Sequence, residues 1–163
     1  MLAPIVLEPE PAVILTVRAA ALSRHAGEIS FPGGLSEPGE TLAQTALREA
    51  HEEIGLDPST PRVLGALPAV HTFVTGILVV PFVGTLDRAP DLVVNEAEID
   101  EVLVLGLERL ALAERRVTYD RPDGSVWRGF AYELDGHTVW GATGWMLHTL
   151  IETIRKETTW PMP

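Results

Sequence analysis

A glutamate-rich segment that follows a glycine-rich loop constrains the structure of this chain more than any other feature. The pattern consists of Gly34, five residues, Glu40, seven residues, and the run Arg48–Leu56, which reads Arg-Glu-Ala-His-Glu-Glu-Ile-Gly-Leu. Glutamate, alanine and leucine are good helix formers, whereas glycine interrupts a helix. We therefore expect a shaped loop that leads into a helix carrying several carboxylates.

Apolar residues indicate the limits and the buried side of this helix. They recur at spacings of four, three and four residues, at Ala43, Leu47, Ala50 and Ile54. This spacing predicts a helix over about Thr41–Ile54 that ends at Gly55. On a helix that turns about 100° per residue, Glu49, Glu52 and Glu53 fall within an arc of roughly 100° on a different side. One side of the helix should pack, and the other should present carboxylates.

Three carboxylates placed so close together repel one another unless cations lie between them. The chain contains no cysteine, so a metal could be bound only through oxygen or imidazole ligands. Hard oxygen ligands favour Mg²⁺ or Mn²⁺ over zinc. The alternative is a solvated acidic helix surface. Gly33 and Gly34 argue against it, because glycines directly ahead of the helix allow close approach of the backbone.

Strands and two further helices are expected along the rest of the chain. The predicted strands are Ala3–Leu7, Ala12–Val17, Arg62–Leu67, Ile77–Leu86, Val102–Leu105, Val117–Tyr119 and Val126–Leu134. The last two flank a turn signal at Asp120–Gly124 and should form a hairpin. Helices are expected at Leu107–Glu114 and Ala142–Lys156. This order predicts a single α/β domain over residues 1–163, with a sheet covered by helices on both faces.

Two longer segments show no helix or strand periodicity. Glycine and proline accumulate between Arg18 and Gly39, which marks a shaped loop. Loops of this length inside a compact domain are usually functional. The segment Asp91–Glu101 is acidic and is also expected to be irregular.

Charge and hydropathy limit the partners of the chain. The formal net charge of −11 would repel the phosphate backbone of DNA or RNA. The apolar runs are far shorter than the roughly 20 residues needed to cross a bilayer, and Met1–Pro11 does not read as a secretory signal. We expect a cytoplasmic protein, monomeric or homodimeric, that binds neither nucleic acid nor membrane. A small phosphorylated substrate remains compatible, since divalent cations can neutralise both carboxylates and phosphates.

The glutamate pattern resembles the signature of the Nudix hydrolases. The resemblance implies a Nudix-type α/β/α sandwich with a central mixed sheet, and hydrolysis of a nucleoside diphosphate linked to another group with Mg²⁺ or Mn²⁺ as cofactor. It implies metal binding by Glu49, Glu52, Glu53 and Gly34. It also implies that Arg48 orients a glutamate.

Attack of water on phosphorus requires a group that accepts the proton. Glu52 is one candidate for this catalytic base, and a residue of the acidic segment Glu96–Glu101 is another. Within that segment we expect Glu98 to assist the metal or the water, because in related enzymes such a segment approaches the metals opposite the helix. The alternative for this segment is a solvated charged loop.

Segments outside the glutamate pattern are similar to the coenzyme A pyrophosphatase branch of the same family. They are Leu15–Ala19, Gly27, Phe31–Gly34, Thr45–Ala50, Asn95–Glu101 and Val139–Thr143. The similarity implies hydrolysis of coenzyme A or its derivatives to 3′,5′-ADP and 4′-phosphopantetheine. One departure is Ser23, where the branch has an arginine and this chain has Arg24 one position later.

The substrate contacts follow from the charge of coenzyme A, which carries a 3′-phosphate besides its diphosphate. Arginine side chains suit such groups, and we expect Arg18, Arg24, Phe31, Gly33 and Gly34 to bind the substrate. Another Nudix substrate is the main alternative, either ADP-ribose, a nucleoside triphosphate or a dinucleotide. A second alternative is a domain of this shape that senses a nucleotide without hydrolysing it.

Overall fold

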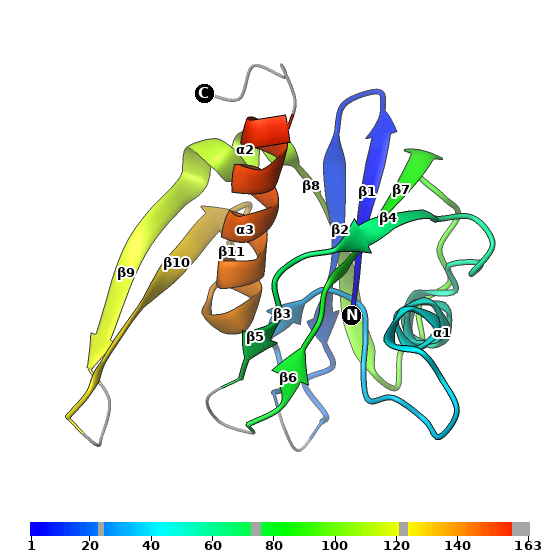
Figure 1. Ribbon diagram of the computed structural model, residues 1–163, viewed down its shortest axis with the longest axis horizontal. Helices are drawn as coiled ribbons and strands as arrows, with labels where there is room; N and C mark the ends of the chain where they lie inside the picture. Colours follow the sequence, from blue (N-terminus) through cyan, green and yellow to red (C-terminus); the bar gives the residue numbers. More distant parts are fainter. Residues whose placement is uncertain (23–24, 73–75, 121–123, 158–163) are drawn as a thin grey trace.

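The two apolar runs at the start of the chain form the middle of a six-stranded sheet (Figure 1). The computed structural model describes residues 1–22, 25–72, 76–120 and 124–157. In it, β1 (Leu2–Glu8) and β2 (Ala12–Arg18) pair in antiparallel orientation. The first five residues of each strand are buried, as expected for strands that are apolar on both faces.

The other strands of this sheet make it mixed. β7 (Phe82–Arg88) runs parallel to β1, and β4 (Arg62–Ala66) pairs antiparallel with β7. β8 (Ile99–Gly106) pairs antiparallel with β2 over the whole of β2. The short β3 (Ile29–Ser30) pairs with the end of β2, so β1 and β3 share the edge of β2 that β8 does not occupy.

Two smaller sheets complete the strands. β5 (Val70–His71) pairs with β6 (Leu78–Val79) in antiparallel orientation. β9 (Glu114–Asp120), β10 (Val126–Leu134) and β11 (His137–Val139) form an antiparallel sheet with β10 in the middle. The predicted hairpin is confirmed by the pairing of β9 with β10. Part of its predicted turn, residues 121–123, lies outside the described residues.

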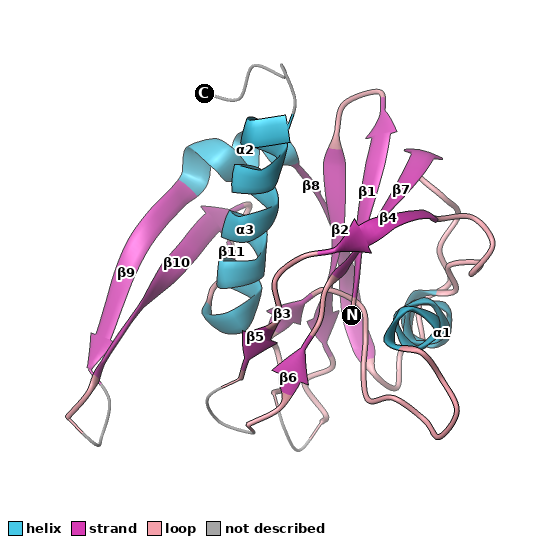
Figure 2. Cartoon of the chain, in the orientation of Figure 1, coloured by secondary structure: helices cyan, strands magenta, loops and turns pink. Residues whose placement is uncertain are grey.

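Helices cover both faces of the six-stranded sheet (Figure 2). On one face, α1 (Leu42–Ile54) packs with residues of β1, β2 and β7: Leu2, Val6, Ile14 and Leu86. On the other face, α2 (Leu107–Ala113) and α3 (Gly141–Glu157) pack with the alternate residues Ala3, Ile5, Val13 and Leu15. Successive strand residues point to opposite faces, so β1 and β2 contribute to both cores. The predicted sandwich with a mixed central sheet is confirmed.

Three element boundaries differ from the sequence predictions because of long-range pairing and proline. The predicted strand Ile77–Leu86 is two strands, β6 and β7, with Pro81 between them, and proline cannot donate to a strand ladder. β8 begins at Ile99, inside the segment predicted to be irregular, because its charged start pairs with the end of β2. β3 likewise lies inside the predicted loop.

Within the part of the chain that the structure describes, none of the helices has the length and apolar character that a membrane crossing requires.

Candidate active site

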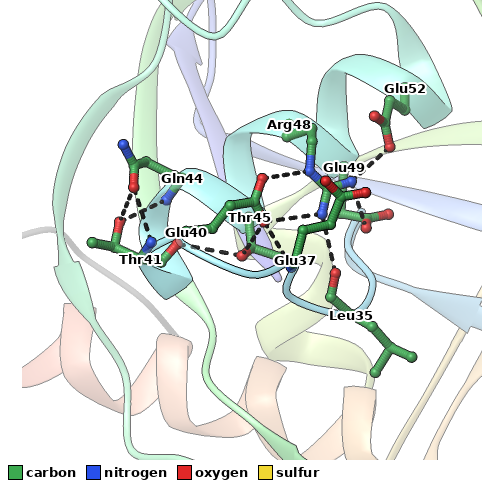
Figure 3. Close-up of polar contacts among 9 residues, drawn as sticks. All are labelled: Leu35, Glu37, Glu40, Thr41, Gln44, Thr45, Arg48, Glu49 and Glu52. Carbon is green, nitrogen blue, oxygen red and sulfur yellow. Dashed lines mark hydrogen bonds and ion pairs between the residues drawn. The ribbon is translucent and has the colours of Figure 1, made fainter.

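Caps at both ends fix the position of α1. At its start, the Thr41 hydroxyl accepts a hydrogen bond from the Gln44 N–H at 3.3 Å, and the Gln44 side chain accepts one from the Thr41 N–H at 2.9 Å (Figure 3). At its end, Gly55 has a left-handed backbone with φ of 68° and donates to the carbonyl of His51. These are stable helix ends, and the helix has nearly the limits that the sequence predicts.

Arg48 contacts three glutamates and the loop ahead of the helix (Figure 3). Its Nε and Nη2 donate to the two carboxylate oxygens of Glu40 at 2.7 and 3.1 Å. Its Nη1 donates to Glu49 at 2.9 Å and to Glu52 at 2.8 Å, while Nη2 also donates to the Leu35 carbonyl at 3.0 Å. Paired contacts between a guanidinium and a carboxylate are directional and strong. Arg48 therefore fixes the glycine-rich loop relative to the helix carboxylates.

Glu40 is the partner of Arg48 that sequence reasoning missed. Its carboxylate also accepts hydrogen bonds from the Glu37 N–H at 3.1 Å and the Thr45 hydroxyl at 2.9 Å. The hydrogen bond from Arg48, followed by that from Glu37, lowers the pKa of Glu40 to about 2. The fixed place of Glu40 in the glutamate pattern is the signal that could have identified it.

Glu53 is a buried carboxylate of α1 whose side chain contacts the glycine-rich loop. Its side chain is 4% exposed, and the Gly33 N–H donates to its Oε2 at 3.0 Å. Burial raises the pKa of Glu53 to about 7, and the neighbouring Glu49 and Glu98 act in the same direction. The Gly33 hydrogen bond and the charge of Arg18 oppose this rise. A carboxylate in this setting has a strong electrostatic preference for a nearby cation.

The loop backbone approaches α1 so closely that only glycine fits at Gly34. A Cβ atom at this position would overlap the Glu49 carboxylate. At Gly33 a Cβ atom would overlap Met1, and φ is 149°. The structure thus places Gly34 against Glu49 and Gly33 against Glu53, whereas Glu52 is linked to these residues through Arg48.

The acidic segment before β8 packs against the end of α1. The Asn95 N–H donates to the Glu53 carbonyl at 2.9 Å, and the Val93 N–H donates to the Ile54 carbonyl at 3.0 Å. The Asn95 side chain donates to Glu98 at 3.2 Å, and the charge of Glu98 raises the pKa of Glu53. Asn95 thus links Glu98 to the end of α1, and a role of Glu98 at the metal or the water stays a prediction.

Arg18 is the positive charge that borders this cluster from β2. Its Nη1 lies 3.9 Å from Glu53 Oε1, and its side chain is partly exposed. Its Nε is buried and has no hydrogen-bond partner within the described residues. A buried unpaired N–H is costly, so the structure leaves a polar group of Arg18 unsatisfied at the border of this cluster.

One predicted substrate contact is buried, and another lies outside the described residues. The prediction for Phe31 is wrong, because its side chain is fully buried in the core between the sheet and α3. An aromatic ring directly after β3 gains more from this packing than from exposure at the loop surface. Arg24 lies outside the described residues.

The donor set has the oxygen chemistry that suits a hard divalent cation, although its carboxylates are bonded to other groups of the chain. Glu49, Glu52 and Glu53 lie on one helix beside the Gly34 backbone, and carboxylates are the ligands that Mg²⁺ and Mn²⁺ prefer. Within the described residues, no three acidic or histidine side chains converge closely enough to hold one ion directly. Arg48 engages Glu49 and Glu52, and Gly33 engages Glu53.

Comparison with known proteins finds relatives that match most of the chain. The model of the NUDIX domain family matches residues 2–123. A protein of Photorhabdus laumondii named uncharacterized Nudix hydrolase NudL is 34% identical over 157 residues, which cover 95% of this chain and 83% of that protein. The protein of the same name from Cronobacter sakazakii is 39% identical over 155 residues, covering 92% of this chain and 79% of its own length.

Solved structures show the same fold. The Nudix hydrolase RenU from M. smegmatis aligns with a TM-score of 0.63 over 99% of this chain and 86% of its own, at 19% identity. A binary complex of the C. elegans Ap4A hydrolase aligns with a TM-score of 0.56 over 66% of this chain and 78% of its own, also at 19% identity.

Proposed function

This chain belongs to the Nudix family, and we therefore propose that it is a metal-dependent pyrophosphohydrolase that cuts a nucleoside diphosphate linked to another group. The proposed substrate is coenzyme A or a derivative, cut to 3′,5′-ADP and a 4′-phosphopantetheine product. The observation that carries the proposal is the close packing of the Gly34 backbone on the Glu49 carboxylate, next to the Gly33 hydrogen bond with Glu53.

The proposed metal ligands are Glu49, Glu52, Glu53 and the backbone of Gly34. Mg²⁺ or Mn²⁺ bound there would lower the pKa of a water molecule and offset the charge of the diphosphate. The chain itself supplies a rigid frame for this chemistry, because the capped helix and the glycine-rich loop are fixed relative to each other by Arg48. No covalent nucleophile is required.

Arg48 acts in this proposal as a positioning residue. Its hydrogen bonds hold Glu49 and Glu52 on the same side of α1 as the loop, and its paired contact with Glu40 anchors the guanidinium. Since the guanidinium stays protonated at all working pH values, it reduces the repulsion between the carboxylates without taking part in proton transfer.

Two residues are proposed for the proton acceptor. Glu52 has a side chain that is 51% exposed, so water can reach it. Glu98 lies on a different segment and accepts a hydrogen bond from Asn95, whose N–H donates to the Glu53 carbonyl. The comparison of Glu52→Gln with Glu98→Gln at saturating Mg²⁺ separates them. Loss of the acidic limb of the pH profile of kcat marks the variant that has lost the acceptor, because a proton acceptor is inactive once it is protonated.

Arg18 supports the preference for a substrate with several phosphates. Its guanidinium borders the carboxylate cluster, and its buried Nε lacks a partner within the described residues. A phosphate oxygen is a strong acceptor for such a group. Arg18 also belongs to the segment Leu15–Ala19, which is similar to the coenzyme A branch.

A substrate panel tests the proposal. The protein is incubated with Mg²⁺ and with coenzyme A, acetyl-coenzyme A, ADP-ribose, a dinucleotide or ATP, and products are identified by mass. We expect 3′,5′-ADP from coenzyme A, and its loss in Glu49→Gln. Glu108→Gln, an exposed glutamate in the first turn of α2, is the matched control. Strong preference for ADP-ribose, a dinucleotide or ATP would assign another Nudix substrate, and tight binding without any product would indicate a sensing domain.

A further inference from the structure

β9 is an edge strand without a partner on its outer side. Its seven residues pair only with β10 within the described chain. In Figure 1 the β9–β10 hairpin extends away from the six-stranded sheet, and β9 forms its outer border. An open edge of this length presents a row of backbone donors and acceptors that can pair with another strand.

The charges along β9 are complementary to those of a second copy of β9 that runs in the opposite direction. Arg115 and Arg116 lie near its start and Asp120 lies at its end, and all three are exposed. No ion pair joins Arg116 or Asp120 to another residue of the described chain, whereas Arg115 lies 3.6 Å from Glu133. In antiparallel pairing the start of one strand faces the end of the other. Two copies of β9 would therefore bring opposite charges together.

Pairing geometry selects one register. Residues that face each other in an antiparallel pair point to the same face of the sheet. The two-fold axis between two copies of β9 must therefore lie where one residue faces the same residue of the second copy. An axis at Thr118 places Arg116 opposite Asp120 of the second copy, twice. An axis at Val117 places Glu114 opposite Asp120, and an axis at Arg116 places two arginines together. Among the seven residues of β9, only the axis at Thr118 forms ion pairs without opposing like charges.

The same register covers apolar surface. It places Val117 opposite Tyr119 of the second copy, and Tyr119 is 45% exposed. Within each chain, the Tyr119 ring stacks on the Trp127 ring with centroids 5.6 Å apart. Aliphatic and aromatic cross-strand pairs stabilise a sheet, so the two hairpins would share a continuous apolar face.

Electrostatic repulsion between two copies of the chain is also weakest at the β9–β10 hairpin. The chain carries a formal charge of −11, but residues 114–134 contain four arginines and four acidic residues. Long-range repulsion between two acidic proteins is therefore weakest when their hairpins approach each other.

We propose that this chain forms a homodimer in which the β9 strands of two copies pair antiparallel about Thr118, with Arg116 of each copy opposite Asp120 of the other. The two three-stranded sheets then form one six-stranded sheet across the dimer. The proposal is independent of the substrate, because it uses no residue of the glutamate site.

Sedimentation equilibrium of charge variants tests this interface. Arg116→Asp and Asp120→Arg each place like charges together twice, and each should weaken dimerisation by about tenfold or more. An equal mixture of the two variants should recover dimers, because every contact then joins opposite charges. The double variant should recover them as well. Arg128→Asp is the matched control, since it makes the same charge change on β10, away from the edge.

Circular dichroism and thermal unfolding establish that each variant is folded. The proposal would be overturned if the wild-type protein stayed monomeric at concentrations up to about 100 μM, because a stable dimer has a dissociation constant well below that concentration. A dimer that is unaffected by both single variants would also overturn it, as would a mixture that dimerises no better than either variant alone.

Discussion

The Gly34 backbone lies directly against the carboxylate of Glu49, with no room for a Cβ atom between loop and helix. This contact joins the glycine-rich loop to the first of the proposed metal ligands. A methyl group at position 34 must displace the Glu49 side chain or the loop, and a displacement of about 1 Å at a reacting site can lower turnover about 100-fold.

We therefore expect Gly34→Ala to lower kcat about 100-fold and to cost about 1–3 kcal/mol of the free energy of unfolding. Steady-state kinetics and urea unfolding measure the two effects. Gly65→Ala is the control, because a Cβ atom at Gly65 meets no other atom within 4 Å. Equal activities of the two variants would remove Gly34 from the site.

Arg48→Lys should lower kcat/KM about 10- to 100-fold although it keeps the positive charge. A lysine cannot reproduce the paired contact with Glu40 together with the contacts to Glu49 and Glu52, and residues that orient metal ligands typically have effects of this size. The Mg²⁺ concentration needed for half-maximal rate should rise as well. Arg88→Lys, which changes an 83% exposed arginine, should leave both quantities unchanged.

Glu40 should contribute stability that disappears in acid. Its pKa is lowered to about 2 in the folded protein, chiefly by Arg48, from an ordinary value of 4.5. A carboxylate with a lowered folded-state pKa contributes its full stabilisation above the ordinary value and loses it as the pH falls toward the folded-state value. The stability difference between wild type and Glu40→Gln should therefore shrink between pH 4.5 and about 2. Chemical unfolding at several pH values measures it, and a constant difference would contradict this origin.

Phe31 should affect stability and not substrate binding. Its ring is fully buried, and replacing a buried phenylalanine with alanine typically costs about 3–5 kcal/mol. Phe31→Leu, which keeps most of the volume, should cost about 1 kcal/mol and leave KM unchanged. A raised KM in Phe31→Leu with unchanged stability would restore the substrate contact that the structure contradicts.

Arg18→Gln should raise the KM for coenzyme A about tenfold, the usual effect of losing a hydrogen bond to a charged group. If Arg18 contacts the 3′-phosphate, the same substitution should change the KM for dephospho-coenzyme A much less. An equal effect on both substrates would instead place the contact on the diphosphate. Thermal unfolding serves as the control, since Arg18 also lies 3.9 Å from Glu53.

Local patterns predicted the helix of the site and the strands beneath it well. The approximate limits of α1, its end at Gly55 and the position of its glutamates follow from the order of residues within one segment. The burial of β1 and β2 follows from their continuous apolarity. These features depend on residues a few positions apart, so the order of residues is sufficient to predict them.

The sequence by itself determined which side of α1 carries carboxylates and that glycines precede it. Only the tertiary structure decided that Phe31 is buried, that Glu40 anchors Arg48 and that the Asn95 backbone packs against the end of α1. The physical reason is distance along the chain. A contact between separate segments depends on the order of strands in the sheet and on which side chains the core can bury. The spacing of neighbouring residues specifies neither of these.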